Sequence, residues 1–175
     1  GPAKAVAGRL DRLYAGRMEM DAARARAGAA AGEMSDGASV IAAAERHLMP
    51  PADAAAEAAV VRGARNVAAF TALLPNPAVD LVVVLLANIR MIRQVAAVYG
   101  GRAGWLGSWR LLRAVATHLV ASGAVSATDD LLGPALGGGI LSKLSRRFGE
   151  AAINAALTAR VGVAAMEVCR PLPFA

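Results

Sequence analysis

Apolar side chains recur at intervals of three and four residues along most of the chain, which is the period of an α-helix and not of a β-strand. The pattern predicts an all-α fold, a compact bundle of about six to seven helices with no strand. The expected helices cover residues 3–31, 38–48, 51–74, 78–99, 105–121, a pliable stretch from 129 onward, and 147–168.

Prolines and glycines set the expected boundaries of these helices. Met49-Pro50-Pro51 is expected to stop the second helix, with Pro51 in the first turn of the third. Pro75 and Pro77 end the third helix, and Gly100-Gly101 is expected to supply the C-cap of the fourth.

The run from Leu81 to Leu86 is apolar nearly all round, so residues 78–99 are predicted to form the central buried helix. A β-strand is the alternative for such a short apolar run. We reject it because the pattern continues at helical spacing through Ile89, Ile92 and Ala96.

The first 32 residues have strong helix propensity but a weak apolar stripe, formed by Val6, Leu10, Leu13 and Met20. We therefore divide the chain into an N-terminal helical arm, residues 1–32, and a helical domain, residues 33–175. The arm is expected to project from the domain or to form a homodimer, which would bury apolar surface. Gly1-Pro2 resembles the remnant of a cleaved purification tag.

The chain is 57% hydrophobic but only 4% aromatic, and its mean hydropathy is +0.46. Small residues at this abundance favour close helix packing over a sheet. A membrane span needs about 18 to 20 consecutive apolar residues. The best candidate, residues 81–92, is interrupted by Asn88 and Arg90, so no segment is expected to qualify.

Charge and motif spacing argue against several kinds of chemistry. The net charge of +6 is spread along the chain without interleaved aromatic residues, so we expect no nucleic-acid partner. The single cysteine, Cys169, excludes an internal disulfide, and His47 and His118 are isolated in sequence, so no metal site or cofactor is expected. A hydrolase built on Cys169 or His118 remains a third hypothesis.

Three glycines at 137–139 precede Lys143 and suggest a phosphate-binding loop. In such a loop, however, glycine stands directly before the lysine and Ser or Thr directly after it, whereas here Ser142 precedes Lys143 and Leu144 follows. We interpret the glycines as a hinge or a close helix contact.

Two tryptophans four residues apart lie among arginines, a composition typical of a helix in a membrane interface. A helix packed on the core by its tryptophan face would look the same, so both interpretations stay open. The candidate membrane-surface residues are Arg102, Trp105, Trp109, Arg110 and Arg113.

The last helix carries polar residues in lines along its otherwise apolar surface. Such residues either form internal contacts that fix the helix register or face a partner. We favour the internal role and expect Glu150 to pair with Arg146 or Arg147. The candidates are Arg147, Glu150, Asn154, Thr158, Arg160, Glu167 and Arg170.

Several motifs resemble those of the YcjF-like family of bacterial inner-membrane proteins. The C-terminal motif runs from Leu144 to Glu150 and continues through Asn154, Thr158 and Cys169-Arg170-Pro171 to Phe174. Two central motifs are Thr71 to Pro77 with Asp80, and Tyr99 to Arg102 with Trp105. The resemblance covers about Tyr14 to Phe174, with Ala151 where we expect glycine.

The resemblance implies a helical domain of unknown function that follows two membrane-spanning helices, on the cytoplasmic side of the inner membrane. It also suggests a P-loop stress-type NTPase of the YcjX type as partner, and it carries no catalytic residues over. Our first hypothesis is thus a non-enzymatic interaction or regulatory domain. A lipid-surface module is the alternative.

Overall fold

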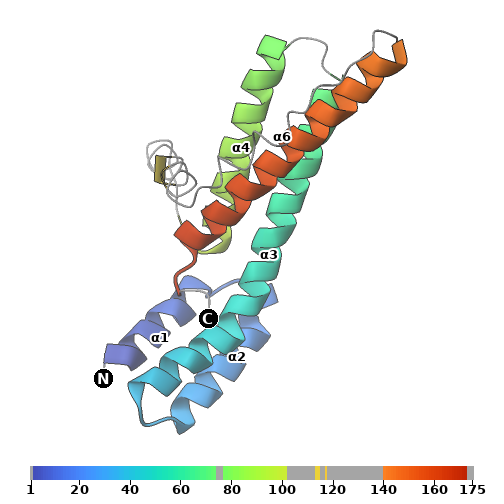
Figure 1. Ribbon diagram of the computed structural model, residues 1–175. Helices are drawn as coiled ribbons and strands as arrows, with labels where there is room; N and C mark the ends of the chain where they lie inside the picture. Colours follow the sequence, from blue (N-terminus) through green and yellow to red (C-terminus); the bar gives the residue numbers. More distant parts are fainter. Residues whose placement is uncertain (1, 74–76, 102–112, 115–116, 118–139, 173–175) are drawn as a thin grey trace.

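The computed structural model describes residues 2–73, 77–101, 113–114, 117 and 140–172. Regular structure in these ranges is entirely helical, which confirms the predicted all-α class. The helices are α1 (Pro2–Leu13), α2 (Met18–Glu33), α3 (Gly37–Leu73), α4 (Pro77–Val98) and α6 (Ile140–Cys169) (Figure 1).

The long helices α3, α4 and α6 form the main body, and small residues allow them to approach closely. A Cβ atom added at Gly162 of α6 would overlap the side chain of Val60 on α3. One added at Gly63 of α3 would lie only 2.7 Å from Sδ of Met91 on α4. The three helices therefore meet at one level, which we call the waist. The branched side chain of Val60 leaves no room for a Cβ at position 162, whereas at position 63 the Met91 side chain would have to shift.

Helix α3 occupies the central position, so the prediction that residues 78–99 form the central buried helix is wrong. In α4 only the C-terminal half is buried, through Met91, Ile92 and Val95. In its N-terminal half Leu81 is 69% exposed and Leu86 57% exposed. The apolar run misled the prediction because a helix that is hydrophobic all round is normally covered on all sides.

The expected helix break at Met49-Pro50-Pro51 is absent, since α3 continues through both prolines. Each proline lacks the N–H that would bond to the carbonyl four residues earlier, so the helix loses two hydrogen bonds there. Figure 1 shows that α3 changes direction partway along its length, as helices do at prolines. Close packing of Leu48, Met49 and Ala52, each at most 2% exposed, compensates for the loss.

The N-terminal segment is not a projecting arm. It forms two helices, α1 and α2, that lie along the first half of α3 (Figure 1). A turn with Gly16 at φ +79° separates them, and Tyr14 and Met20 beside the turn are buried in the common core. Arg24 of α2 donates two hydrogen bonds, 2.8 and 3.0 Å, to the carboxylate of Asp11 on α1.

The turn between α1 and α2 is fastened to the end of α4. Arg17 donates to the carbonyl oxygens of Val98 (2.6 Å) and Ala97 (2.8 Å), which the helix itself leaves unpaired. Gly100, at φ +87°, ends α4 as predicted. The N–H of Gly101 bonds to the Ala96 carbonyl and that of Gly100 to the Ala97 carbonyl, a Schellman motif.

Two helical stretches have the length and composition of a membrane span, contrary to the expectation from uninterrupted apolar runs. They are Val79–Val98, with mean hydropathy 1.8, and Arg146–Cys169, with mean hydropathy 1.3. Only 28% of each stretch is buried among the described residues. Length and hydropathy do not separate a spanning helix from a core helix, so this finding alone does not place either stretch in a membrane.

Candidate functional site

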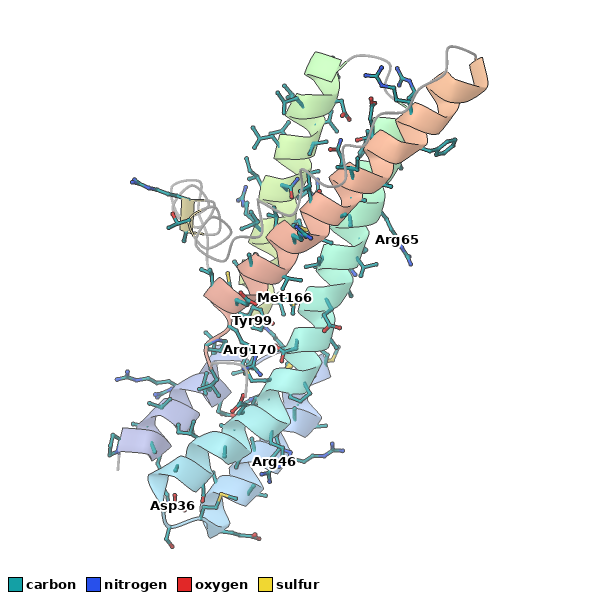
Figure 2. The ribbon with its side chains drawn as sticks, in the orientation of Figure 1. Asp36, Arg46, Arg65, Tyr99, Met166 and Arg170 are labelled. Atoms are coloured by element: carbon teal, nitrogen blue, oxygen red, sulfur yellow. The ribbon has the colours of Figure 1, made fainter. Side chains whose placement is uncertain are left out.

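A buried charged cluster joins the C-terminal ends of α4 and α6 to α3. We call it the Arg170 cluster, and it consists of Glu45, Asp53, Tyr99 and Arg170 (Figure 2). The guanidinium of Arg170 bonds to both carboxylate oxygens of Asp53 at 3.1 to 3.2 Å, to Glu45 at 3.2 Å and to the carbonyl of Leu172 at 2.7 Å. The hydroxyl of Tyr99 donates to Asp53 at 2.7 Å.

The electrostatics of the Arg170 cluster favour its charged, fully bonded form. Burial opposes the charge of Arg170, whose side chain is only 6% exposed, but hydrogen bonds to Asp53 and Glu45 outweigh this and raise its pKa. Burial, followed by the hydrogen bond to Asp53, raises the pKa of Tyr99 far above its ordinary value. Both oxygens of the Asp53 carboxylate therefore accept hydrogen bonds from Arg170, and one of them also accepts the bond from Tyr99.

A second cluster lies on the other side of the waist. We call it the Asn154 cluster, and it joins α3, α4 and α6 through Thr71, Asp80 and Asn154. The Thr71 hydroxyl donates to Asp80 at 2.9 Å, while the Asn154 amide donates to Thr71 at 3.1 Å and to Asp80 at 3.3 Å. Closer to the waist, the Asn88 amide donates to the Val84 carbonyl and to the hydroxyl of Thr158, which is 1% exposed.

The two clusters divide the candidate residues of α6 into an inward and an outward set. Asn154, Thr158 and Arg170 point inward and bond to other helices, as the internal interpretation expects. The outward residues Glu150, Arg160 and Glu167 are exposed, and Arg147 is half-buried. Glu150 pairs with Arg146 at 3.0 Å, as predicted. Both side chains are at least half exposed, so this pair contributes little to stability, and the internal structural role expected for Glu150 is wrong.

The candidate membrane-surface residues lie mostly outside the described residues. Arg102, Trp105, Trp109 and Arg110 fall there, as does His118, while Arg113 is exposed. Their expected role in lipid binding stays a prediction.

Burial raises the pKa of the Cys169 thiol, so the thiol stays protonated at neutral pH, the opposite of what an activated nucleophile needs. In the part of the chain that the structure describes, no group of three His, Cys, Asp or Glu side chains is arranged to hold a metal ion.

Sequence reasoning missed the acidic half of the Arg170 cluster. With a new helix expected to begin at Pro51, Asp53 would lie in its first turn, where a carboxylate interacts with the helix dipole. Because α3 continues through the prolines, Asp53 lies inside a helix and faces Arg170 instead. Glu45 and Asp53 are eight residues apart, which puts both on one face of α3, and this spacing was the available signal.

An apolar and basic groove lies between α3 and α4, on the same side of the waist as the Asn154 cluster. Its volume is about 470 Å³. Arg62 and Asn66 of α3 and Arg90 and Gln94 of α4 line one part of it, and the rest of the lining is largely apolar.

The described residues thus define an all-helical domain, whose buried polar side chains tie three long helices together. The chain belongs to the family described as a domain of unknown function, DUF697, whose model matches residues 35–175. This agrees with the resemblance to the YcjF-like family.

Curated relatives extend the match to the N-terminal helices. The chain is 46% identical over 172 residues to a UPF0283 membrane protein of Rhizobium etli, covering 98% of this chain and 48% of the relative. It is 50% identical over 153 residues to one of Bradyrhizobium diazoefficiens, covering 87% and 45%, and 42% identical over 173 residues to one of Agrobacterium fabrum, covering 99% and 48%. The chain therefore spans about half the length of these relatives. No solved structure matches it.

Proposed function

We propose that the chain is a non-enzymatic interaction and regulatory domain of a bacterial inner-membrane protein, on the cytoplasmic side of the membrane. The observation that carries the proposal is the division of polar residues on α6. Asn154, Thr158 and Arg170 hold the helices together, so the body is a rigid frame. Arg160 and Glu167 lie on the exposed face of the same helix, where a partner can reach them.

Two further findings support this assignment. The relatives are named membrane proteins, and none of the three is named for an enzymatic activity. The cysteine considered as a nucleophile has a raised pKa, which disfavours the thiolate.

The partner that we propose is a P-loop stress-type NTPase of the YcjX type, because the resemblance to the YcjF-like family implies one. The outer face of α6 presents Ala152, Ala156 and Val163 between its charged residues. Small and apolar residues flanked by charges suit the docking of a second protein, since they allow close approach while the charges set the register. A homodimer through the same face is the competing assembly.

The proposal is tested by a binding assay with the purified chain and a purified YcjX-type NTPase, without nucleotide and with ADP or a non-hydrolysable ATP analogue. Arg160→Glu should weaken binding by about tenfold or more, because it reverses a charge on the proposed face. The matched control is Arg46→Glu, at an exposed arginine on the lower part of α3 (Figure 2), which should bind as the parent does.

Circular dichroism melts establish that both variants fold. Light scattering of the chain alone reports the competing homodimer. Absence of NTPase binding in every nucleotide state, or equal binding by the two variants, would overturn the proposal.

A further inference from the structure

The groove between α3 and α4 has a polar end and an apolar end. At the polar end, near the waist, Arg62 faces Arg90 across the groove, with Asn66 and Gln94 beside them. With the residues that the structure describes, neither arginine forms an ion pair or a hydrogen bond. Two unpaired guanidinium groups beside two amides form a site for an anionic group such as a phosphate.

The apolar end runs from these arginines to the tips of the two helices. Phe70, Val83 and Leu86 line it, and Leu73 on α3 and Val79 on α4 continue the apolar surface beyond it on the same helix faces. Phe70 is 46% exposed and Leu73 is 78% exposed. Such side chains on two adjacent helices make an apolar patch larger than isolated surface residues would.

The distance from the arginines to the helix tips is close to the depth of one lipid leaflet. Eleven residues separate Arg62 from Leu73 on α3, and eleven separate Val79 from Arg90 on α4. At 1.5 Å per residue, each stretch is about 16 Å long, about half of the roughly 30 Å hydrocarbon core. The order of groups along the groove, charged and then apolar, is also the order along a phospholipid. Asp80, in the same stretch of α4, does not line the groove and bonds to Thr71 and Asn154 instead.

Other occupants fit this surface less well. A second copy of the chain would bring Arg62, Arg90 and the adjacent, exposed Arg93 against the same residues, and like charges would repel. An acidic protein would pair with the arginines but has no need of an apolar surface that extends for one leaflet beyond them. A bilayer supplies both anionic headgroups and apolar chains, and the relatives are named membrane proteins.

From this geometry we infer that the α3–α4 groove binds an anionic phospholipid of the membrane, with the headgroup phosphate at Arg62 and Arg90 and an acyl chain along Phe70, Val83 and Leu86. Only the α3–α4 side of the body enters the leaflet. The first turns of α6 carry Arg146, Arg147 and Glu150, and Figure 1 shows this end of α6 diverging from the end of α4. These charges stay in water while the α3–α4 tips are immersed.

Flotation of the purified chain with vesicles tests the inference. We expect binding to vesicles of phosphatidylcholine with phosphatidylglycerol, and little to phosphatidylcholine alone. The double variant Arg62→Glu, Arg90→Glu should reduce the bound fraction about tenfold or more. The matched control Arg26→Glu, Arg46→Glu reverses two exposed arginines on α2 and on the first half of α3, which do not line the groove and lie on the other side of the waist, and it should lose much less. Figure 2 shows Arg46 on the lower part of α3.

A fluorescent probe reports whether the apolar end enters the bilayer. Cys169 is the only cysteine, so Val79→Cys in a Cys169→Ala background carries an environment-sensitive label at one site, on the groove face of α4. Its emission should shift to the blue with phosphatidylglycerol vesicles, whereas a label at Val163→Cys on the outer face of α6 should not shift.

Inorganic phosphate at millimolar concentration should leave flotation unchanged, which separates a lipid headgroup from free phosphate. Equal binding to both vesicle types, an unaffected Arg62/Arg90 variant, or an unshifted label at position 79 would each overturn the inference. The test is independent of the proposed NTPase interaction. Arg160→Glu should still float, and the Arg62/Arg90 variant should still bind the NTPase.

Discussion

Replacing Arg170 with alanine should be among the most destabilising single substitutions in the described part of the molecule. The arginine side chain is 6% exposed, and its partners Asp53 and Glu45 are only 19% and 24% exposed. Arg170→Ala leaves Asp53 with the Tyr99 hydroxyl as its remaining side-chain donor and removes the guanidinium from Glu45. Two carboxylates then remain largely buried without their counterion.

The magnitude follows from burial. Breaking a buried ion pair by removing one partner costs about 3–5 kcal/mol, because the remaining charge is uncompensated. The exposed pair Arg146–Glu150 is the internal reference, since its side chains are 74% and 50% exposed. Exposed pairs contribute about 0.2–1 kcal/mol, so Arg146→Ala should cost no more than about 0.5 kcal/mol. At about 2–4 °C per kcal/mol for a chain of this size, Arg170→Ala should lower Tm by about 6–20 °C.

Urea unfolding followed by circular dichroism measures both variants in the same buffer. The free energy of unfolding of Arg170→Lys should lie between those of the parent and Arg170→Ala, because lysine keeps the positive charge but lacks the planar guanidinium group with its several hydrogen-bond donors. Adding Asp53→Asn to Arg170→Met should recover part of the loss, because the second change removes one of the orphaned charges. A difference of less than about 1 kcal/mol between Arg170→Ala and Arg146→Ala would refute the reasoning.

Three further predictions concern a close helix contact, a helix cap and the two tyrosines. Gly162→Ala should lower the free energy of unfolding by about 1–3 kcal/mol, because the added Cβ atom meets the Val60 side chain. Gly149→Ala adds a Cβ atom in open space and should raise the free energy of unfolding by up to about 1 kcal/mol. Equal stability of the two variants in urea unfolding would contradict both expectations. The Asp36 carboxylate accepts hydrogen bonds from Ser39 at the start of α3, and these bonds lower the pKa of the carboxyl group. The carboxylate therefore stabilises the folded chain above the pKa of the unfolded state, and this contribution is lost as pH falls below about 4. Asp36→Asn should accordingly show a smaller loss of Tm between pH 5 and pH 3 than the parent does. Burial raises the pKa of both tyrosines, Tyr14 and Tyr99, so their contribution to the free energy of unfolding is present below about pH 10 and is lost above it. Absorbance at 295 nm should show no phenolate until the protein unfolds at alkaline pH. Titration of the tyrosines in the folded chain at their ordinary pKa would contradict the burial.

Local signals in the sequence predicted the helical class and several helix ends correctly. The period of apolar residues identified helices throughout the described part, and Gly100 was recognised as a C-cap because glycine adopts the positive φ that this position needs. The pairing of Glu150 with Arg146 followed from their spacing of one helical turn.

Long-range packing decided the features that sequence reasoning missed. The rule that proline ends a helix fails at Pro50 and Pro51, because burial of Leu48, Met49 and Ala52 sustains the helix across the gap in its hydrogen bonds. No local pattern reports that burial in advance.

The N-terminal helices show the same limit. Their weak apolar stripe suggested an arm, yet Tyr14 is fully buried and Arg17 reaches carbonyls 80 residues away in sequence. The candidate residues of α6 could be named from the sequence, but their division into inward and outward sets could not. Asn154 bonds to Thr71 and Asp80 on two other helices, whereas Arg160 lies on the exposed face of α6, and only the packing of the helices distinguishes the two.

The waist also fixes where the three long helices cross. Val60 and Gly63 are three residues apart on α3, so α6 and α4 cross it within about one helical turn of each other. The Asn154 cluster and the Arg170 cluster hold the same helices on either side of this crossing. With the helices held at three levels, a larger side chain at Gly162 can be admitted only by a displacement of α6 that also lengthens hydrogen bonds in the clusters, so a packing error at the waist is felt along the whole body.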